Sequence, residues 1–230
     1  MTFLELLAPA RNADIGIAAI DCGADAVYIA GPQFGARKDA WNPVSEIARL
    51  CEHAHKFGAR VFVTVNILLR DDEMEEVHRQ MLEEQEAGAD AFIIRDMRIC
   101  GWDDITVPLH ASTQCAIRSV EDAKRYEAAG YSRIVLEREL PLSTIKDICA
   151  AVNCEVECFV HGALCVCYSG ECRLSEYLDG RSADRGECIQ ACRSMYDLAD
   201  ESGKVLVRNK ALLSLKDLNL KARQIGRAHV

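Results

Sequence analysis

The cysteines of this chain are unevenly distributed, and their clustering is the strongest sign of chemistry in the sequence. Eight of the twelve lie within residues 149–192. The densest part is the run 161–172, and Cys188 and Cys192 follow it. Thiolates gathered this closely in a reducing compartment usually hold a metal or carry out redox chemistry.

Four of these cysteines form the ligand set that we favour, namely Cys165, Cys172, Cys188 and Cys192. Three residues separate Cys188 from Cys192, which suits zinc, whereas the six between Cys165 and Cys172 make a long zinc loop. Iron–sulfur clusters tolerate irregular spacing if four thiolates converge. Spacing alone therefore leaves zinc and iron–sulfur both open, with Cys167 as a rival ligand. A nucleophilic cysteine paired with His161 is a further alternative.

The expected compartment is the cytoplasm. The first seven residues carry an acid, Glu5, and no basic segment, so they do not resemble a signal peptide. No run reaches the roughly 18 apolar residues that a membrane span needs, so no membrane partner is expected. At 230 residues and 50% hydrophobic composition, the chain has enough material for a core without disulfides.

The charge of the chain is also uneven. A formal net charge of -9 argues against a protein that coats nucleic acid through bulk electrostatics. Residues 161–230, however, carry 11 Lys and Arg against 9 Asp and Glu. A mildly basic cysteine-rich end permits RNA or another anionic partner there, without requiring one. The sequence does not predict the oligomeric state.

A repeat organises the first part of the chain. A glycine that ends an amphipathic segment and precedes a short apolar run recurs at residues 22–29, 57–64, 87–94 and, more loosely, 129–136. A helix that ends at a glycine and leads into a buried parallel strand produces this pattern. The spacing of the glycines suits βα units.

The repeat predicts a (β/α) TIM-like barrel, complete or with an altered last unit, followed by a Cys-rich segment. An open doubly wound sheet is the alternative, but no Gly-rich dinucleotide or Walker fingerprint follows any expected strand. We expect strands at 5–7, 26–29, 61–66, 91–95, 109–111, 134–137 and 155–160. Helices are expected at 13–22, 44–57, 73–87, 120–129 and 143–152.

Polar residues that follow the expected strands are the candidates for catalysis, because barrel chemistry sits where strands end. His110, Glu137 and His161 are the catalytic candidates. Glu137 would carry a proton, and His161 lies four residues before Cys165. The alternative is that such residues only bond to one another.

Three further residues are predicted to bind substrate. Arg138 offers a guanidinium fork to a carboxylate, and Asn66 ends an expected strand. Arg37 lies in a Gly- and Pro-containing loop after the second expected strand, where it could meet an anion or simply belong to the loop. Together they predict a small anionic ligand.

The sequence suggests three parts. Residues 1–160 form the barrel body, and 161–224 form a cluster-binding segment with the start of a C-terminal region. Residues 225–230 read as a non-native tail on a C-terminally truncated chain. A helix is expected over 213–223, with Ser214 as its N-cap.

Several motifs resemble those of peptidase family U32, the collagenase-like peptidases. The main motif runs from Glu157 through His161-Gly-Ala-Leu-Cys165 to Gly170-Glu-Cys172-Arg-Leu-Ser175. The run Gly186-Glu-Cys188-Ile-Gln-Ala-Cys192-Arg193 is also similar. So are Glu5-Leu-Leu-Ala-Pro9, Gly23-Ala-Asp-Ala-Val-Tyr28 and His110-Ala-Ser-Thr113, and the resemblance covers residues 4–220.

The resemblance implies two kinds of activity. Some members are named as collagenase-like proteases. Others act in hydroxylation of a tRNA wobble uridine or of a large-subunit rRNA cytidine, with prephenate implicated. Cys165, Cys172, Cys188 and Cys192 match the cysteines that hold a 4Fe-4S cluster in such relatives, and Cys167 stands where relatives usually lack cysteine. An iron–sulfur enzyme of RNA hydroxylation is therefore the first expectation. A peptidase and a non-catalytic cluster-bearing scaffold are the alternatives.

Overall fold

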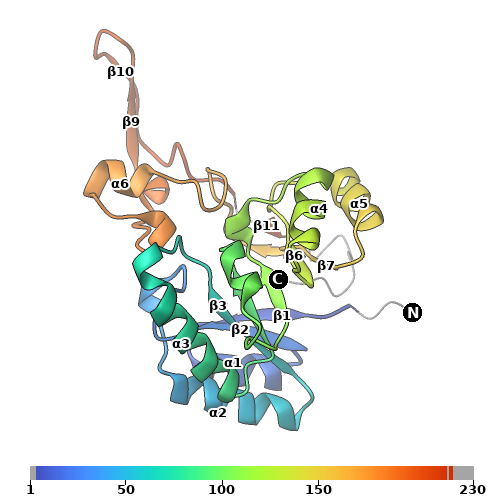
Figure 1. The fold of residues 1–230 in the computed structure, drawn as a ribbon. Coiled ribbons are helices and arrows are strands. Elements are labelled where there is room, and N and C mark those ends of the chain that lie inside the picture. Colours follow the sequence, from blue (N-terminus) through green and yellow to red (C-terminus); the bar gives the residue numbers. More distant parts are fainter. Residues whose placement is uncertain (1–3, 217, 220–230) are drawn as a thin grey trace.

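A sheet of seven parallel strands curls through the body of the molecule, with helices on its outer side (Figure 1). The computed structural model describes residues 4–216 and 218–219. No helix within these ranges is long and apolar enough to cross a membrane.

The strands follow one another in chain order across the sheet, each parallel to the next. They are β1 (Leu7–Ala10), β2 (Ala26–Ala30), β3 (Arg60–Val65), β4 (Ala91–Ile94), β5 (Leu109–Ala111), β6 (Arg133–Val135) and β7 (Glu155–Glu157). Within the described ranges β7 does not pair back with β1.

Five helices connect the strands: α1 (Ala13–Asp21), α2 (Val44–Lys56), α3 (Met74–Glu86), α4 (Val120–Ala128) and α5 (Leu142–Ala151). Local chemistry fixes their ends. The Asn12 side chain accepts from the backbone of Ile15, and that of Ser119 accepts from Asp122. The glycines of the repeat all have positive φ after helices, as the sequence predicts: Gly23, Gly58, Gly88 and Gly130.

These features confirm the TIM-like fold with an altered last unit. A doubly wound sheet would reverse its strand order, and this sheet does not. The first strand is misplaced by the prediction, which put it at 5–7. Glu5 instead precedes the strand and is buried.

The interior of the curled sheet divides into an apolar and a charged part. Leu7, Phe62 and Ile93 belong to a small apolar cluster inside the sheet. Between β6, β7 and β1, the buried guanidinium of Arg133 lies 2.7 Å from Glu5 Oε1 and 3.3 Å from Glu157 Oε2. These ion pairs thus connect β6 and β7 to the residue before β1, although β7 and β1 form no strand pairing in the described ranges.

The cysteine-rich segment leaves the body after β7 and has little regular structure. It contains β8 (His161–Gly162), α6 (Leu174–Asp179) and a projecting hairpin, β9 (Tyr196–Ala199) with β10 (Val205–Lys210) (Figure 1). The helix predicted over 213–223 is wrong where the structure describes it. Residues 214–216 are irregular, and β11 (Leu218–Asn219) pairs antiparallel with β8. Residues 217 and 220–223 of that prediction, and the tail at 225–230, lie outside the described residues.

One buried acid makes folding dependent on pH. Glu84 on α3 is fully buried, its Oε1 accepts from Gln80 at 2.9 Å, and its Oε2 has no hydrogen-bond partner. Burial is the main reason that the pKa of Glu84 rises from 4.5 to about 8. The folded state therefore binds this proton more tightly than the unfolded state does.

We predict that the free energy of unfolding falls as pH rises from 4.5 to about 8, by up to about 1 kcal/mol per pH unit from this group. Glu84→Gln should flatten that slope, because it keeps the shape of the side chain without the proton. Urea denaturation between these pH values measures it. Glu75→Gln, an exposed change on the same helix, should leave the slope intact. An unchanged slope in Glu84→Gln would contradict the assignment.

Candidate functional site

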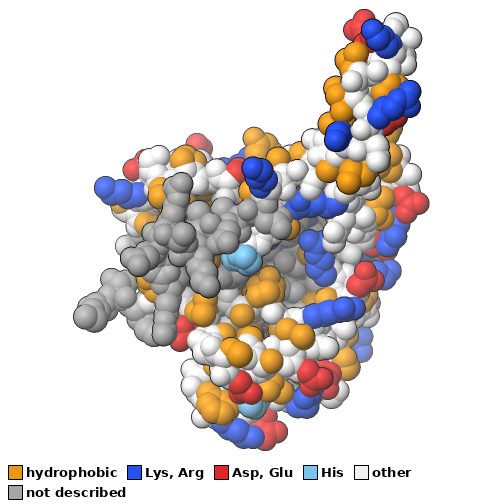
Figure 2. Space-filling model, turned by 180° about the vertical axis from the view of Figure 1, so that it is seen from behind, with side chains coloured by type: hydrophobic (Ala, Val, Ile, Leu, Met, Phe, Trp, Pro, Cys, Tyr) orange, Lys and Arg blue, Asp and Glu red, His pale blue; other side chains and the backbone are white. Residues whose placement is uncertain are grey.

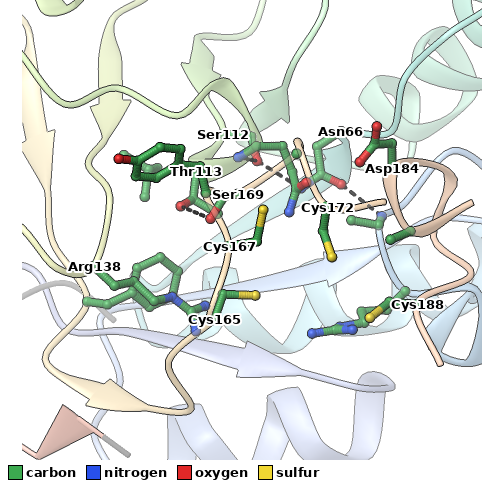
Figure 3. Close-up of a pocket in the computed structure, with 18 of the residues that line it drawn as sticks. Asn66, Ser112, Thr113, Arg138, Cys165, Cys167, Ser169, Cys172, Asp184 and Cys188 are labelled. Atoms are coloured by element: carbon green, nitrogen blue, oxygen red, sulfur yellow. Dashed lines mark hydrogen bonds between the residues drawn. The ribbon is translucent and has the colours of Figure 1, made fainter. Parts of the chain in front are cut away.

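A cavity of about 210 Å³ lies at the carboxyl ends of the strands, between the sheet and the cysteine-rich segment (Figure 3). Its floor comes from inward-facing residues of neighbouring strands, which alternate with outward-facing residues because the side-chain period of a strand is two. The floor residues are Tyr28, Thr64, Ile93, Val135 and Glu157. This is the edge at which β/α barrels place their chemistry.

Five thiols form the opposite wall of the cavity, and all four predicted ligands are among them: Cys165, Cys172, Cys188 and Cys192, together with Cys167. Figure 3 shows the sulfur atoms of Cys165, Cys167, Cys172 and Cys188 around one space. No three His, Cys, Asp or Glu side chains within residues 4–216 and 218–219 are grouped so that they could hold a single metal ion. The thiols thus share a cavity without converging on one point.

The buried carboxylate of Glu137 fixes the part of this wall that carries Cys167 and Cys172. Glu137, which follows β6, accepts from the backbone N–H of Ser169 at 2.7 Å and from its hydroxyl at 3.1 Å. Ser169 lies midway between Cys167 and Cys172. Both carboxylate oxygens of Glu137 are therefore used to fix the loop that carries these two thiols.

Arg185 and Arg193 fix the part of the wall that carries Cys188 and Cys192. Arg185 Nη2 lies 2.5 Å from Glu73 Oε1, and Arg185 also donates to the carbonyl of Leu68. This ion pair lowers the pKa of Glu73. Arg193, next to Cys192, donates to the carbonyl of Leu164 at 2.9 Å. Separate stretches of the segment are thereby tied to the body and to each other.

Close approach at Gly170 further fixes the loop. Its φ is +75°, and a Cβ there would lie 2.4 Å from the carbonyl oxygen of Gln114. Arg95 Nη2 donates to the Gly170 carbonyl at 3.0 Å. Only glycine lets this turn lie against the loop after β5.

Arg138 is the predicted anion-binding residue that the structure brings into the cavity. Its guanidinium carbon lies 3.9 Å from the centre of the Phe159 ring, and Nη1 donates to the carbonyl of Ala163. Its Nε is buried without a hydrogen-bond partner. Burial is the main cause that lowers the pKa of Arg138, and the nearby Tyr28 and Cys165 oppose it.

The pKa of the Cys165 thiol also depends on burial and on nearby ionisable groups. Burial raises the pKa of its thiol, and the nearby Cys192, Cys188 and Cys172 raise it further, while Arg138 lowers it. The negative charge of one thiolate therefore disfavours ionisation of the neighbouring thiols. A cationic group bound among them would remove that repulsion.

Asn66 and Arg37, the other predicted substrate-binding residues, also line the cavity. Asn66 is largely committed to local structure, since its Oδ1 accepts from Ala36 at 2.9 Å and its Nδ2 donates to Ser112 at 3.0 Å. Arg37 is exposed at the rim.

The three predicted catalytic residues do not line the cavity. His110 is buried inside the sheet, edge-on to Phe62 at 4.8 Å between ring centres. His161 is exposed on β8. Glu137 supports the loop from behind, as described above.

Sequence reasoning missed several polar residues that line the cavity, among them Tyr28, Glu157 and Asp184. Burial raises the pKa of Glu157 to about 7, opposed by Arg133. Asp184 is buried with Oδ1 unpartnered, and burial raises its pKa as well. The alternation of β2 and β7 was the available signal for Tyr28 and Glu157. Asp184 lies in a single 3-10 turn, Ala183–Arg185, which is too short to show a periodic pattern.

Comparison with known proteins gives the family. The sequence profile described as Peptidase family U32 matches residues 11–225. The chain belongs to peptidase family U32.

Relatives of this chain include proteins named for RNA modification. The 23S rRNA 5-hydroxycytidine synthase of Escherichia coli is 51% identical over 93% of this chain and 33% of its own length. A tRNA hydroxylation protein of Bacillus subtilis is 36% identical over 86% of this chain and 48% of its own length. This U32 chain thus spans a third to a half of the length of these relatives.

Other U32 proteins carry different names. A relative from Porphyromonas gingivalis named collagenase is 32% identical over 93% of this chain and 55% of its own length. The solved structure of a U32 peptidase is similar with a TM-score of 0.60, 13% identity and 71% of each chain covered, which supports the fold alone.

The contact at Gly170 predicts a position-specific effect. Gly170→Ala should cost about 3 kcal/mol or more of folding free energy, because the Cβ meets a backbone oxygen at 2.4 Å. Gly180→Ala is the matched control. Its φ is +66° with open space around a Cβ, so about 1 kcal/mol of backbone strain is expected. Urea denaturation compares the two, and equal costs would show that the contact is unimportant.

Proposed function

We propose that this chain is the barrel region of an iron–sulfur enzyme that hydroxylates a base of tRNA or large-subunit rRNA. The observation that carries the proposal is the shared cavity, where four family-matching thiols face the strand ends together with Arg138. The two relatives named for RNA hydroxylation support the choice of reaction.

The cofactor that we propose is one 4Fe-4S cluster, held by Cys165, Cys172, Cys188 and Cys192. The four thiols line one cavity, and a 4Fe-4S cluster takes one thiolate per iron. The six residues between Cys165 and Cys172 make a long zinc loop, whereas cluster ligands tolerate irregular spacing. When bound, such a cluster supplies one-electron chemistry. Zinc remains the alternative that metal analysis distinguishes.

Arg138 is proposed to bind a small anion, with prephenate as the candidate co-substrate. No ion pair joins Arg138 to a carboxylate within residues 4–216 and 218–219. Glu137, its neighbour, is occupied by Ser169. Arg138 lines the cavity and has no carboxylate partner there among the described residues, so its guanidinium provides a site for a carboxylate.

The surface supports an RNA partner. Figure 2 shows Lys and Arg side chains on the hairpin and on the face below it, interspersed with acidic side chains. The basic side chains on this face could contact a phosphate backbone despite the overall net charge of -9.

A peptidase is the second candidate, favoured by the relative named collagenase. Its weakness is that neither predicted catalytic histidine accompanies Cys165 in the cavity. Cys165 lines the cavity, whereas His161 and His110 do not. A non-catalytic scaffold is the third candidate, and loss of RNA hydroxylation in a deletion strain would exclude it.

The ligand set predicts which cysteine substitutions matter. Single Ser substitutions at Cys165, Cys172, Cys188 or Cys192 in the full-length protein should lower iron content to less than about half and reduce thermal stability, since metal binding is coupled to folding. Cys167→Ser is the matched control, because it removes a thiol from the same cavity and should change neither. Full iron retention in Cys192→Ser would reject this set.

The anion site predicts a difference between two cationic side chains. Arg138→Lys in the full-length protein should weaken prephenate binding about tenfold, because the ammonium keeps the charge and loses the planar fork. Isothermal titration calorimetry measures it, and Arg125→Lys, an exposed change on α4, should have no effect. Unchanged affinity in Arg138→Lys would make Arg138 a structural residue.

A further inference from the structure

A half-exposed aromatic ring stands at the mouth of the cavity. Tyr168 lies between Cys167 and the anchored Ser169, lines the cavity, and is 48% exposed. The guanidinium carbon of Arg118 lies 3.7 Å from the centre of its ring. One face of the ring is thus covered by a cation, while much of the side chain remains open.

Both partners of this stack are fixed to the end of β6. Ser169 is held by Glu137 through two hydrogen bonds. Ile117, next to Arg118, bridges to Leu136, and the Glu137 N–H donates to the Ile117 carbonyl at 3.1 Å. The chain beside the ring and the chain beside the guanidinium are therefore both held by Glu137, which lowers the ordering needed when a ligand stacks there.

The chemistry of the stack fits a nucleobase. Single-stranded RNA is recognised by bases that stack on aromatic rings and on guanidinium planes. An enzyme that modifies a base must also take it out of its stack and into a pocket. A rigid Tyr–Arg pair beside a cavity lined by thiols meets both needs.

We propose that Tyr168, backed by Arg118, is the platform on which the target base of a single-stranded RNA segment stacks at the mouth of the cavity. This proposal rests on the proposed function and adds to it the place where the base is received. The competing role is structural, with Tyr168 only covering the stem of Arg118.

The test uses the full-length protein and a fluorescent RNA hairpin whose loop holds a single cytidine. Tyr168→Leu should weaken binding of this hairpin about tenfold in fluorescence anisotropy. Tyr168→Phe keeps the ring and should restore binding. An abasic site in place of the cytidine should weaken wild-type binding by a similar factor, and Tyr168→Leu should then have no further effect.

Tyr177→Leu is the matched control, because Tyr177 is 85% exposed on α6 and does not line the cavity. Its affinity for the hairpin should stay at the wild-type value. Iron content and melting temperature of each variant separate loss of stacking from loss of folding.

Three results would overturn the platform. In the first, Tyr168→Leu binds as tightly as wild type; in the second, it weakens the intact and the abasic hairpin equally. In the third, it weakens binding of a collagen peptide and not of RNA. If wild-type protein neither binds nor hydroxylates RNA, the proposed function fails as well, whereas hydroxylation with no effect of Tyr168→Leu rejects the platform alone.

Discussion

The cavity depends on the buried carboxylate of Glu137. The two carboxylate oxygens accept the hydrogen bonds from the backbone N–H and the hydroxyl of Ser169. The backbone N–H of Glu137 donates to the loop that carries Arg118. The cysteine-rich segment has little helix or strand to order it, so such tertiary contacts must do so. Glu137, a catalytic candidate in the sequence, thus also holds the loop that carries Cys167 and Cys172 over the strand ends.

The elements of the barrel could be predicted because each repeat unit carries its own signals. A C-cap glycine and a buried apolar run identify a βα unit without tertiary information. The first strand was misplaced because Glu5 and Pro9 obscure its pattern, and the burial of Glu5 is explained by ion pairs with Arg60 and Arg133, which lie far along the chain. Whether the sheet closes also depends on the pairing of its outermost strands, which local pattern does not encode.

The candidate site was predictable in part, for similar reasons. Asn66 and Arg138 line the cavity because residues at strand ends share an edge of the sheet. The four cysteines line it because the segment after β7 passes over that edge. His110 and His161 do not line it, because side-chain direction and the path of that segment decide access. Tyr168 lies in irregular structure and Asp184 in a single 3-10 turn, Ala183–Arg185, where only the folded contacts reveal their place.

We propose that the thiol wall holds an iron–sulfur cluster in an RNA-hydroxylating U32 protein. Anaerobic purification of the full-length protein, with iron, acid-labile sulfide and zinc measured on the same sample, tests this proposal most directly. We expect about four irons and four sulfides per chain, as for one 4Fe-4S cluster. One zinc per chain without iron or sulfide would contradict it.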